Sequence, residues 1–163
     1  MFSLVFYLFV TNTYCQEIEN CKCKSRNFKL IKKEGLQIDT TLVKINGIYI
    51  FKDSIIDLKN IKRDRYSFCR FFENGRVFFS CGYFNFPHES DLNNLSYGYY
   101  GEYKIIKNQI IIESYSSYVG YILELYKIEG LKIISTDFAK RSNKPKFEKV
   151  FSSIEYDFYK FKL

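Results

Sequence analysis

The segment from Tyr66 to Tyr83 places two aromatic-rich runs on either side of Asn74-Gly75. Asn-Gly between such runs is the strongest short-range signal for a β-hairpin, because glycine adopts positive φ without a steric penalty. The composition agrees, since aromatic residues make up 20% of the chain and alanine, the best helix former, occurs only at Ala139. We therefore predict an all-β protein, and 163 residues suffice for one domain with a sizeable core.

Further strands are predicted along the chain, separated by short turns such as Lys107-Asn108 and Glu129-Gly130. With the central hairpin, the predicted strands cover residues 42–51, 66–72, 76–84, 97–106, 109–115, 118–128, 131–136 and 153–162. Ser90 begins a short predicted helix, and a second helical turn is expected within the polar, broken stretch 53–64. This pattern is typical of a sandwich or an up-and-down barrel, which we place in residues 42–163.

The N-terminal residues 1–16 carry no charge and include an apolar run from Phe2 to Val10. This run is too short to cross a bilayer and fits the apolar core of a secretory signal peptide, although no Lys or Arg precedes it. The alternative is a buried N-terminal strand. Lipid anchoring through Cys15 is less favoured, because Tyr14 is not the small residue that should precede a lipidated cysteine. Residues 17–41 are expected to form a lead-in segment.

Export would place the remaining cysteines in an oxidising compartment, where they can form disulfides in three ways. Cys69 and Cys81 flank the central hairpin but do not fall directly opposite each other, so a bond between them would need a bulge or a longer loop. Cys21-Lys22-Cys23 lacks the two-residue spacing and the second knuckle of a zinc site. We expect no metal and no cofactor.

The net charge of +7 comes from basic residues spread along the chain, apart from modest clusters at Lys59–Arg65 and Lys140–Lys149. A nucleic-acid binder would concentrate them in one stripe. We therefore interpret them as a solvated surface and expect no nucleic-acid partner, with an RNA- or DNA-binding barrel as the alternative.

Three local motifs resemble those of the lipocalin-like (calycin) barrels, particularly the small exported lipocalin-like proteins of bacteria. Gly47-Ile48-Tyr49 stands where the family has Gly-x-Trp, and Phe71–Val77 is similar to its aromatic-x-x-Asn-Gly hairpin. The run Gly98–Ile105 followed by Asn108-Gln109-Ile110 is similar to its Gly-x-Tyr strand and turn. The resemblance implies a single antiparallel up-and-down barrel of about eight strands that holds a small apolar molecule or has no known ligand.

Period-two alternation predicts which side chains face the barrel interior. Glu102, Lys104 and Glu113 should face water. In the last strand, the odd-numbered acids and the even-numbered Lys160 and Lys162 cannot all face water with strict alternation, so we predict a bulge near Phe158-Tyr159. An interior of tyrosine and isoleucine can be a filled core or a ligand site. If it is a ligand site, we expect the contacts to come from Tyr99, Tyr103, Ile105, Ile110, Ile112 and Tyr121.

Arg70 lies among aromatic residues of the central hairpin. It is a candidate for binding an anionic head group, although an outward-facing Arg is the favoured interpretation. His88 is the only histidine, and we expect it on a surface loop. No nucleophile motif or phosphate loop accompanies it, and Glu155 and Asp157 should share a wet face, so we predict no enzyme.

We predict an exported, non-catalytic protein that binds a small hydrophobic or amphipathic ligand inside the barrel. The alternative is a cell-envelope interaction module with a solid core.

Overall fold

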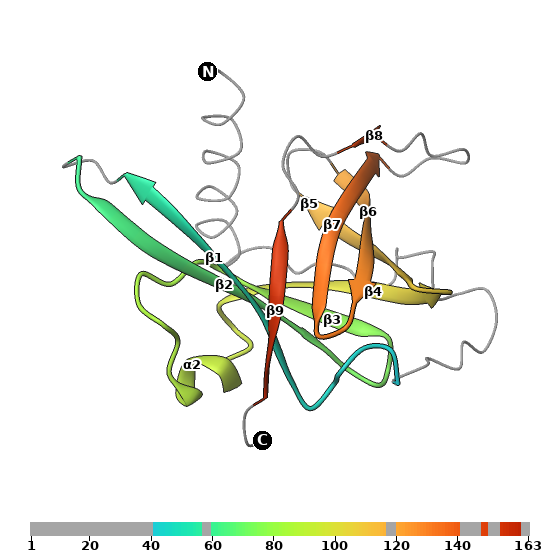
Figure 1. The fold of residues 1–163 in the computed structure, drawn as a ribbon, viewed down its shortest axis with the longest axis horizontal. Coiled ribbons are helices and arrows are strands. Elements are labelled where there is room, and N and C mark those ends of the chain that lie inside the picture. The colour runs from blue at the N-terminus through green and yellow to red at the C-terminus, as the bar shows by residue number, and fades with distance from the viewer. Residues whose placement is uncertain (1–40, 57–59, 117–119, 141–147, 150–153, 161–163) are drawn as a thin grey trace.

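The computed structural model describes residues 41–56, 60–116, 120–140, 148–149 and 154–160 (Figure 1). The predicted signal peptide and most of the lead-in segment lie outside the described residues. So do Cys15, Cys21 and Cys23, and most of the basic stretch Lys140–Lys149. The described elements are β1 (Gly47–Ile56), β2 (Lys62–Phe71), β3 (Arg76–Ser80), α2 (Glu89–Asn93), β4 (Gly98–Ile106), β5 (Gln109–Ser116), β6 (Gly120–Glu129), β7 (Lys132–Lys140), β8 (Glu148–Lys149) and β9 (Glu155–Lys160).

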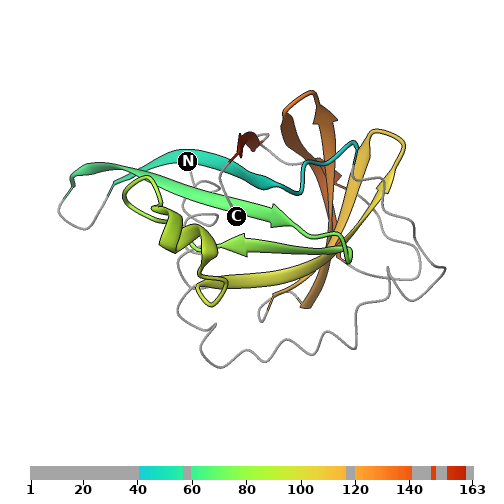
Figure 2. The ribbon, with the colours of Figure 1, turned by 90° about the horizontal axis from the view of Figure 1, so that it is seen from below.

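The strands form a closed antiparallel up-and-down barrel, which confirms the predicted fold class. Strands β1 to β6 pair each with the next, β6 pairs with β7, and β9 lies between β7 and β1 to complete the ring of eight. The two-residue strand β8 pairs with the far end of β7. In Figure 2 the strands surround a common interior, and α2 lies outside the ring beside β2 and β3.

The central hairpin has a three-residue loop. The backbone NH of Phe72 donates to the carbonyl of Arg76, and Gly75 has φ of 79°. Asn74 keeps a negative φ, and its side-chain oxygen accepts from the NH of Arg76. A three-residue loop with glycine in the left-handed region is a common hairpin connection, and it places Cys69 opposite Phe79 rather than Cys81.

Alternation along the strands builds two apolar clusters. The inner cluster fills the middle of the barrel with fully buried side chains that include Tyr49, Phe71 and Tyr103. The outer cluster packs Ile48, Phe68 and Phe78 beneath Leu92 of α2. The predicted helix near Ser90 therefore exists, and its apolar residue covers the outer side of the barrel.

The stretch 53–64 differs from the expectation of a broken segment with a helical turn. Strand β1 continues to Ile56 and β2 begins at Lys62, so the two strands extend as a paired ribbon beyond their neighbours (Figure 1). Charged residues that suggested a loop pair across the two strands instead. Cross-strand pairs of opposite charge stabilise such a ribbon.

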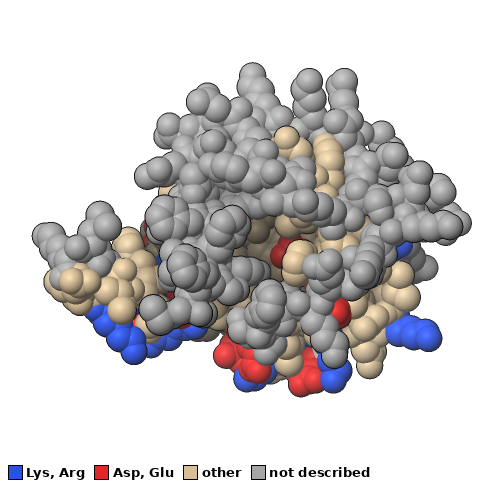
Figure 3. All heavy atoms as spheres, turned by 90° about the horizontal axis from the view of Figure 1, so that it is seen from above, with Lys and Arg blue, Asp and Glu red and all other residues tan. Residues whose placement is uncertain are grey.

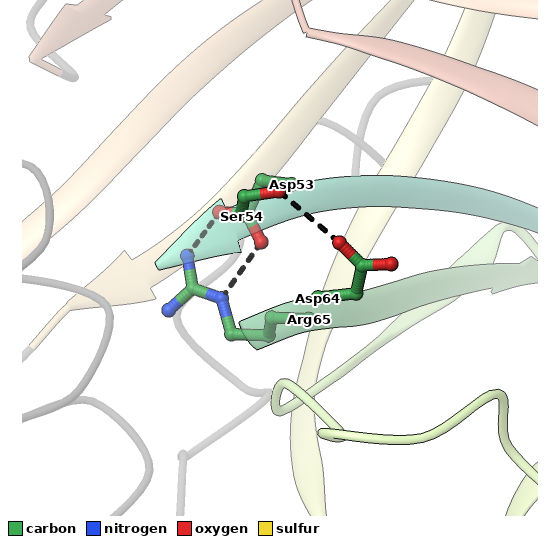
Figure 4. Close-up of polar contacts among 4 residues, drawn as sticks. All are labelled: Asp53, Ser54, Asp64 and Arg65. Atoms are coloured by element: carbon green, nitrogen blue, oxygen red, sulfur yellow. Dashed lines mark hydrogen bonds and ion pairs between the residues drawn. The ribbon is translucent and has the colours of Figure 1, made fainter. Parts of the chain in front are cut away.

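Two polar pairs of different burial hold this ribbon (Figure 4). Arg65 donates from Nε to Oδ1 of Asp53 at 3.0 Å and from its guanidinium to Oδ2, and these side chains are only 11% and 23% exposed. On the other face, Asp64 accepts from Ser54 at 3.1 Å and pairs with Lys52 at 2.7 Å, in a setting that is about half exposed. The buried Arg65–Asp53 pair is therefore the stronger of the two constraints.

Other expectations are corrected by the strand registers. The register of β9 with β1 is continuous from Asp157 to Lys160, so the predicted bulge near Phe158-Tyr159 is wrong. The irregularity lies instead between β6 and β7, where Tyr126 pairs with Ser135 and the next residue, Leu125, pairs with Asp137. The extra residue, Thr136, donates its hydroxyl to the carbonyl of Leu125. Glu113 was expected in water, but it is only 1% exposed although it lies on the outer side of β5.

The pair of Arg65 and Asp53 gives a stability prediction. D53N removes the charge that balances a buried guanidinium, so we expect a loss of about 2–3 kcal/mol in the free energy of unfolding. D64N alters the exposed pair on the same ribbon and should cost much less, because solvent screens that pair. Urea denaturation of both variants measures the difference, and equal losses would contradict the prediction.

Candidate functional site

The candidate site is the inner wall of β5 and β6, near the ends of these strands that lie away from the Lys107-Asn108 turn. Ile112 of β5 pairs with Glu124 of β6, and Ser114 pairs with Ile122. Tyr126, two residues after Glu124, belongs to the inner cluster. Because side chains two residues apart share a face, Glu124 projects into the barrel interior.

Two hydroxyl groups donate to the Glu124 carboxyl group. Ser114 Oγ lies 3.4 Å from Oε2, and the Tyr126 hydroxyl lies 3.4 Å from Oε1. Both distances exceed the range of about 2.5–3.0 Å that is usual for hydrogen bonds between oxygen atoms. The carboxyl group is therefore held weakly and keeps capacity to accept a stronger donor.

Burial dominates the electrostatics of this carboxyl group. Desolvation raises the pKa of Glu124 to about 7, partly offset by the bonds from Tyr126 and Ser114. The nearby Cys69 thiol and Tyr126 hydroxyl also have pKa values well above their ordinary ones, through burial first and the Glu124 charge second. No Lys or Arg of the described chain contributes to the Glu124 shift. Among the side chains that the structure describes, the contacts of Glu124 thus come from hydroxyl groups and include no cation.

This end of the barrel is accessible, whereas the middle is packed. Tyr126, Ile110 and Ile112 are almost completely buried. Phe138 of β7 pairs directly with Glu124 and is nevertheless 38% exposed, and Ile122 and Glu124 are themselves only partly buried. Figure 3 views the molecule from above and shows an acidic side chain near the middle of this face. The inner wall is therefore less buried at this end, where Phe138 exposes part of its ring, than in the middle of the barrel.

The residues predicted for ligand binding divide between the two faces of the barrel wall. The interior cluster contains Tyr99, Tyr103, Ile105, Ile110 and Ile112. Tyr99 stacks on Phe79 with ring centroids 5.1 Å apart, and the Tyr103 hydroxyl donates to the carbonyl of Phe72 at 2.9 Å. These positions line or fill the lumen.

Tyr121 and Arg70 lie on the opposite face from the lumen. Tyr121 pairs with Tyr115 across β5 and β6, with ring centroids 5.0 Å apart, at odd positions that alternate with Glu124 and Tyr126. The Arg70 guanidinium lies 5.2 Å from the ring centroid of Phe72, beside the outer cluster. The structure does not bring these two residues to the inner wall.

Glu124 was not among the residues singled out from the sequence. Its signal was its position between Ile122 and Tyr126 on one face of a strand, where an acid interrupts an apolar series. The opposite face carries Leu123 and Leu125, so either face could have been the inner one. Alternation alone could not assign the direction of this strand.

Other polar residues take part in contacts that stabilise the fold. His88 precedes α2, and its backbone NH donates to the Asp91 carboxylate at 2.9 Å. Lys132 pairs with Glu155 and Asp157 on an exposed surface. Across the described ranges, no cluster of three or more His, Cys, Asp or Glu residues could hold a metal ion.

The two described cysteines differ in state. Cys69 is a free, buried thiol and Cys81 is disulfide-bonded. The pairing of Cys69 with Cys81 is therefore excluded, and the partner of Cys81 lies outside the described residues.

No family model, curated protein or solved structure matches the chain. Within the described residues, no helix combines the length and apolar character that crossing a membrane requires.

Glu124 gives a pH-dependent stability prediction. Burial raises its pKa from an ordinary value of 4.5 to about 7 in the folded state, so the carboxyl group keeps its proton to about pH 7. An acid with a raised folded pKa destabilises the fold as pH increases between these two values, by roughly 3 kcal/mol in total. We expect the free energy of unfolding of the wild type to fall over this range relative to that of E124Q.

The matched control is E129Q, which neutralises an exposed carboxylate at the end of the same strand. The free energy of unfolding of E129Q should change with pH as that of the wild type does. Parallel profiles for wild type and E124Q, measured by urea denaturation, would contradict the raised pKa.

Proposed function

We propose that this chain is an exported lipocalin-like protein that binds a small amphipathic molecule at the accessible end of its barrel, without catalysis. The observation that carries the proposal is a partly buried acid, Glu124, in an otherwise apolar and aromatic inner wall. Ligand sites combine such a wall with a few polar groups that orient the guest. Ile122, Phe138 and Tyr99 would contact the apolar part and Glu124 the polar part.

Three features support export and a non-catalytic role. The disulfide at Cys81 is typical of an oxidising compartment. Burial raises the pKa of the Cys69 thiol, whereas reactive cysteines have lowered pKa values. Ser114 is buried and donates only a long bond to a carboxyl group, without a histidine between them.

A binding experiment tests the location of the site. Ile122 lies on the inner wall and Ile56 is 71% exposed at the end of the β1–β2 ribbon. I122W would fill the accessible end, so we expect it to weaken the binding of a neutral fluorescent probe, N-phenyl-1-naphthylamine, by at least about tenfold. I56W makes the same substitution outside the barrel and should bind the probe like the wild type.

Titration by probe fluorescence measures both variants after the protein has been freed of lipid. Native mass spectrometry of protein taken directly from its producing cells should also show a bound small molecule. A wild type that binds no probe and carries no molecule would contradict the proposal.

The exposed aromatic residues of the outer surface favour a second function, docking of an envelope protein. Phe84, Phe86, Tyr97 and Tyr159 are each more than 40% exposed, and the Phe86 ring contacts those of Tyr66 and Tyr159. A photo-reactive residue at position 86 should then form one defined cross-link in the cell envelope. The same residue at Glu89, which is exposed on α2, should form none.

A further inference from the structure

The surroundings of Glu124 restrict the chemistry of a guest. Its carboxyl group faces Ser114 on β5, Tyr126 on β6 and Phe138 on β7, and its charge influences Cys69 on β2. Tyr99 and Tyr156 complete the group of titratable side chains around Tyr126. None of these side chains is basic, so an ionised Glu124 has no positive charge among them to pair with.

A guest that supplies the positive charge would remove the main electrostatic cost of this site. An ammonium group offers three donors to a carboxyl group that holds only two long hydrogen bonds. Nearby tyrosine and phenylalanine rings favour cations near their faces. An anionic guest would instead meet a like charge, and a neutral alcohol would gain only an ordinary hydrogen bond.

We propose that the guest is an amphipathic organic amine whose ammonium group pairs with the Glu124 carboxylate and whose apolar body lies against Ile122, Phe138 and Tyr99. This inference rests on the binding function proposed above and adds the charge of the ligand to it.

Proton linkage gives the inference a distinctive pH dependence. Below pH 7 the carboxyl group of the free protein is protonated, so binding a cation first requires its ionisation. The affinity for an amine should therefore be constant above pH 7 and fall by up to about tenfold per pH unit below it. A carboxylic acid guest should show the opposite trend.

Three molecules with eight carbon atoms each provide the test: n-octylamine, 1-octanol and octanoate, each used to displace the neutral probe. At pH 8 we expect octylamine to bind about tenfold more tightly than octanol, and octanoate to bind most weakly. E124Q, which has nearly the same shape without the charge, should bind octylamine and octanol equally. E129Q should behave like the wild type.

The outcomes separate this inference from the function on which it rests. If the probe binds but octylamine has no advantage over octanol, or keeps its advantage in E124Q, the inference is wrong and the barrel remains a carrier. A preference for octanoate at pH 8 overturns it in the same way. If neither the probe nor any of the three molecules binds, the proposed function fails first.

Discussion

The hydrogen bonds that close the sheet on itself are the constraint on which the rest of this structure depends. Strand β9 pairs with β1 on one side and β7 on the other, although it is only six residues long. Closure gives every strand of the ring two neighbours and separates an inner face from an outer one. The burial of Tyr103 and the isolation of Glu124 both follow from being on the inner face.

The same closure explains why one carboxyl group would carry the specificity that we propose for this barrel. In the packed middle, Ile110, Ile112 and Tyr126 leave little surface for a guest. At the less buried end, the raised pKa of Glu124 lowers the free energy of unfolding at neutral pH. A cationic guest would restore that free energy by pairing with the carboxylate. Instability of the empty protein and affinity for the guest would then have one origin.

The strands and their turns could be predicted from the sequence because period-two alternation and residues such as Asn74-Gly75 and Gly130 act locally. The β1–β2 ribbon could not, since Asp53 and Arg65 each suggest a loop when considered alone and become strand residues only through their partner. Glu124 was missed for a related reason: both faces of its strand are apolar, and only the barrel decides which is inner. Local sequence likewise could not show that Cys69 is a free, buried thiol, because its burial depends on strands that are distant in the chain.

The β1–β2 ribbon has a consequence for self-association. Beyond its pairing with β9, which ends at Ile50, β1 continues to Ile56 as one edge of the ribbon, and Lys62 to Asp64 lie at the start of β2 on the other. Strand edges in general can recruit strands from other molecules and seed fibres. The alternating cations and anions here would each have to lose water in such a stack, so the residues that lengthen the ribbon also act as gatekeepers against its polymerisation.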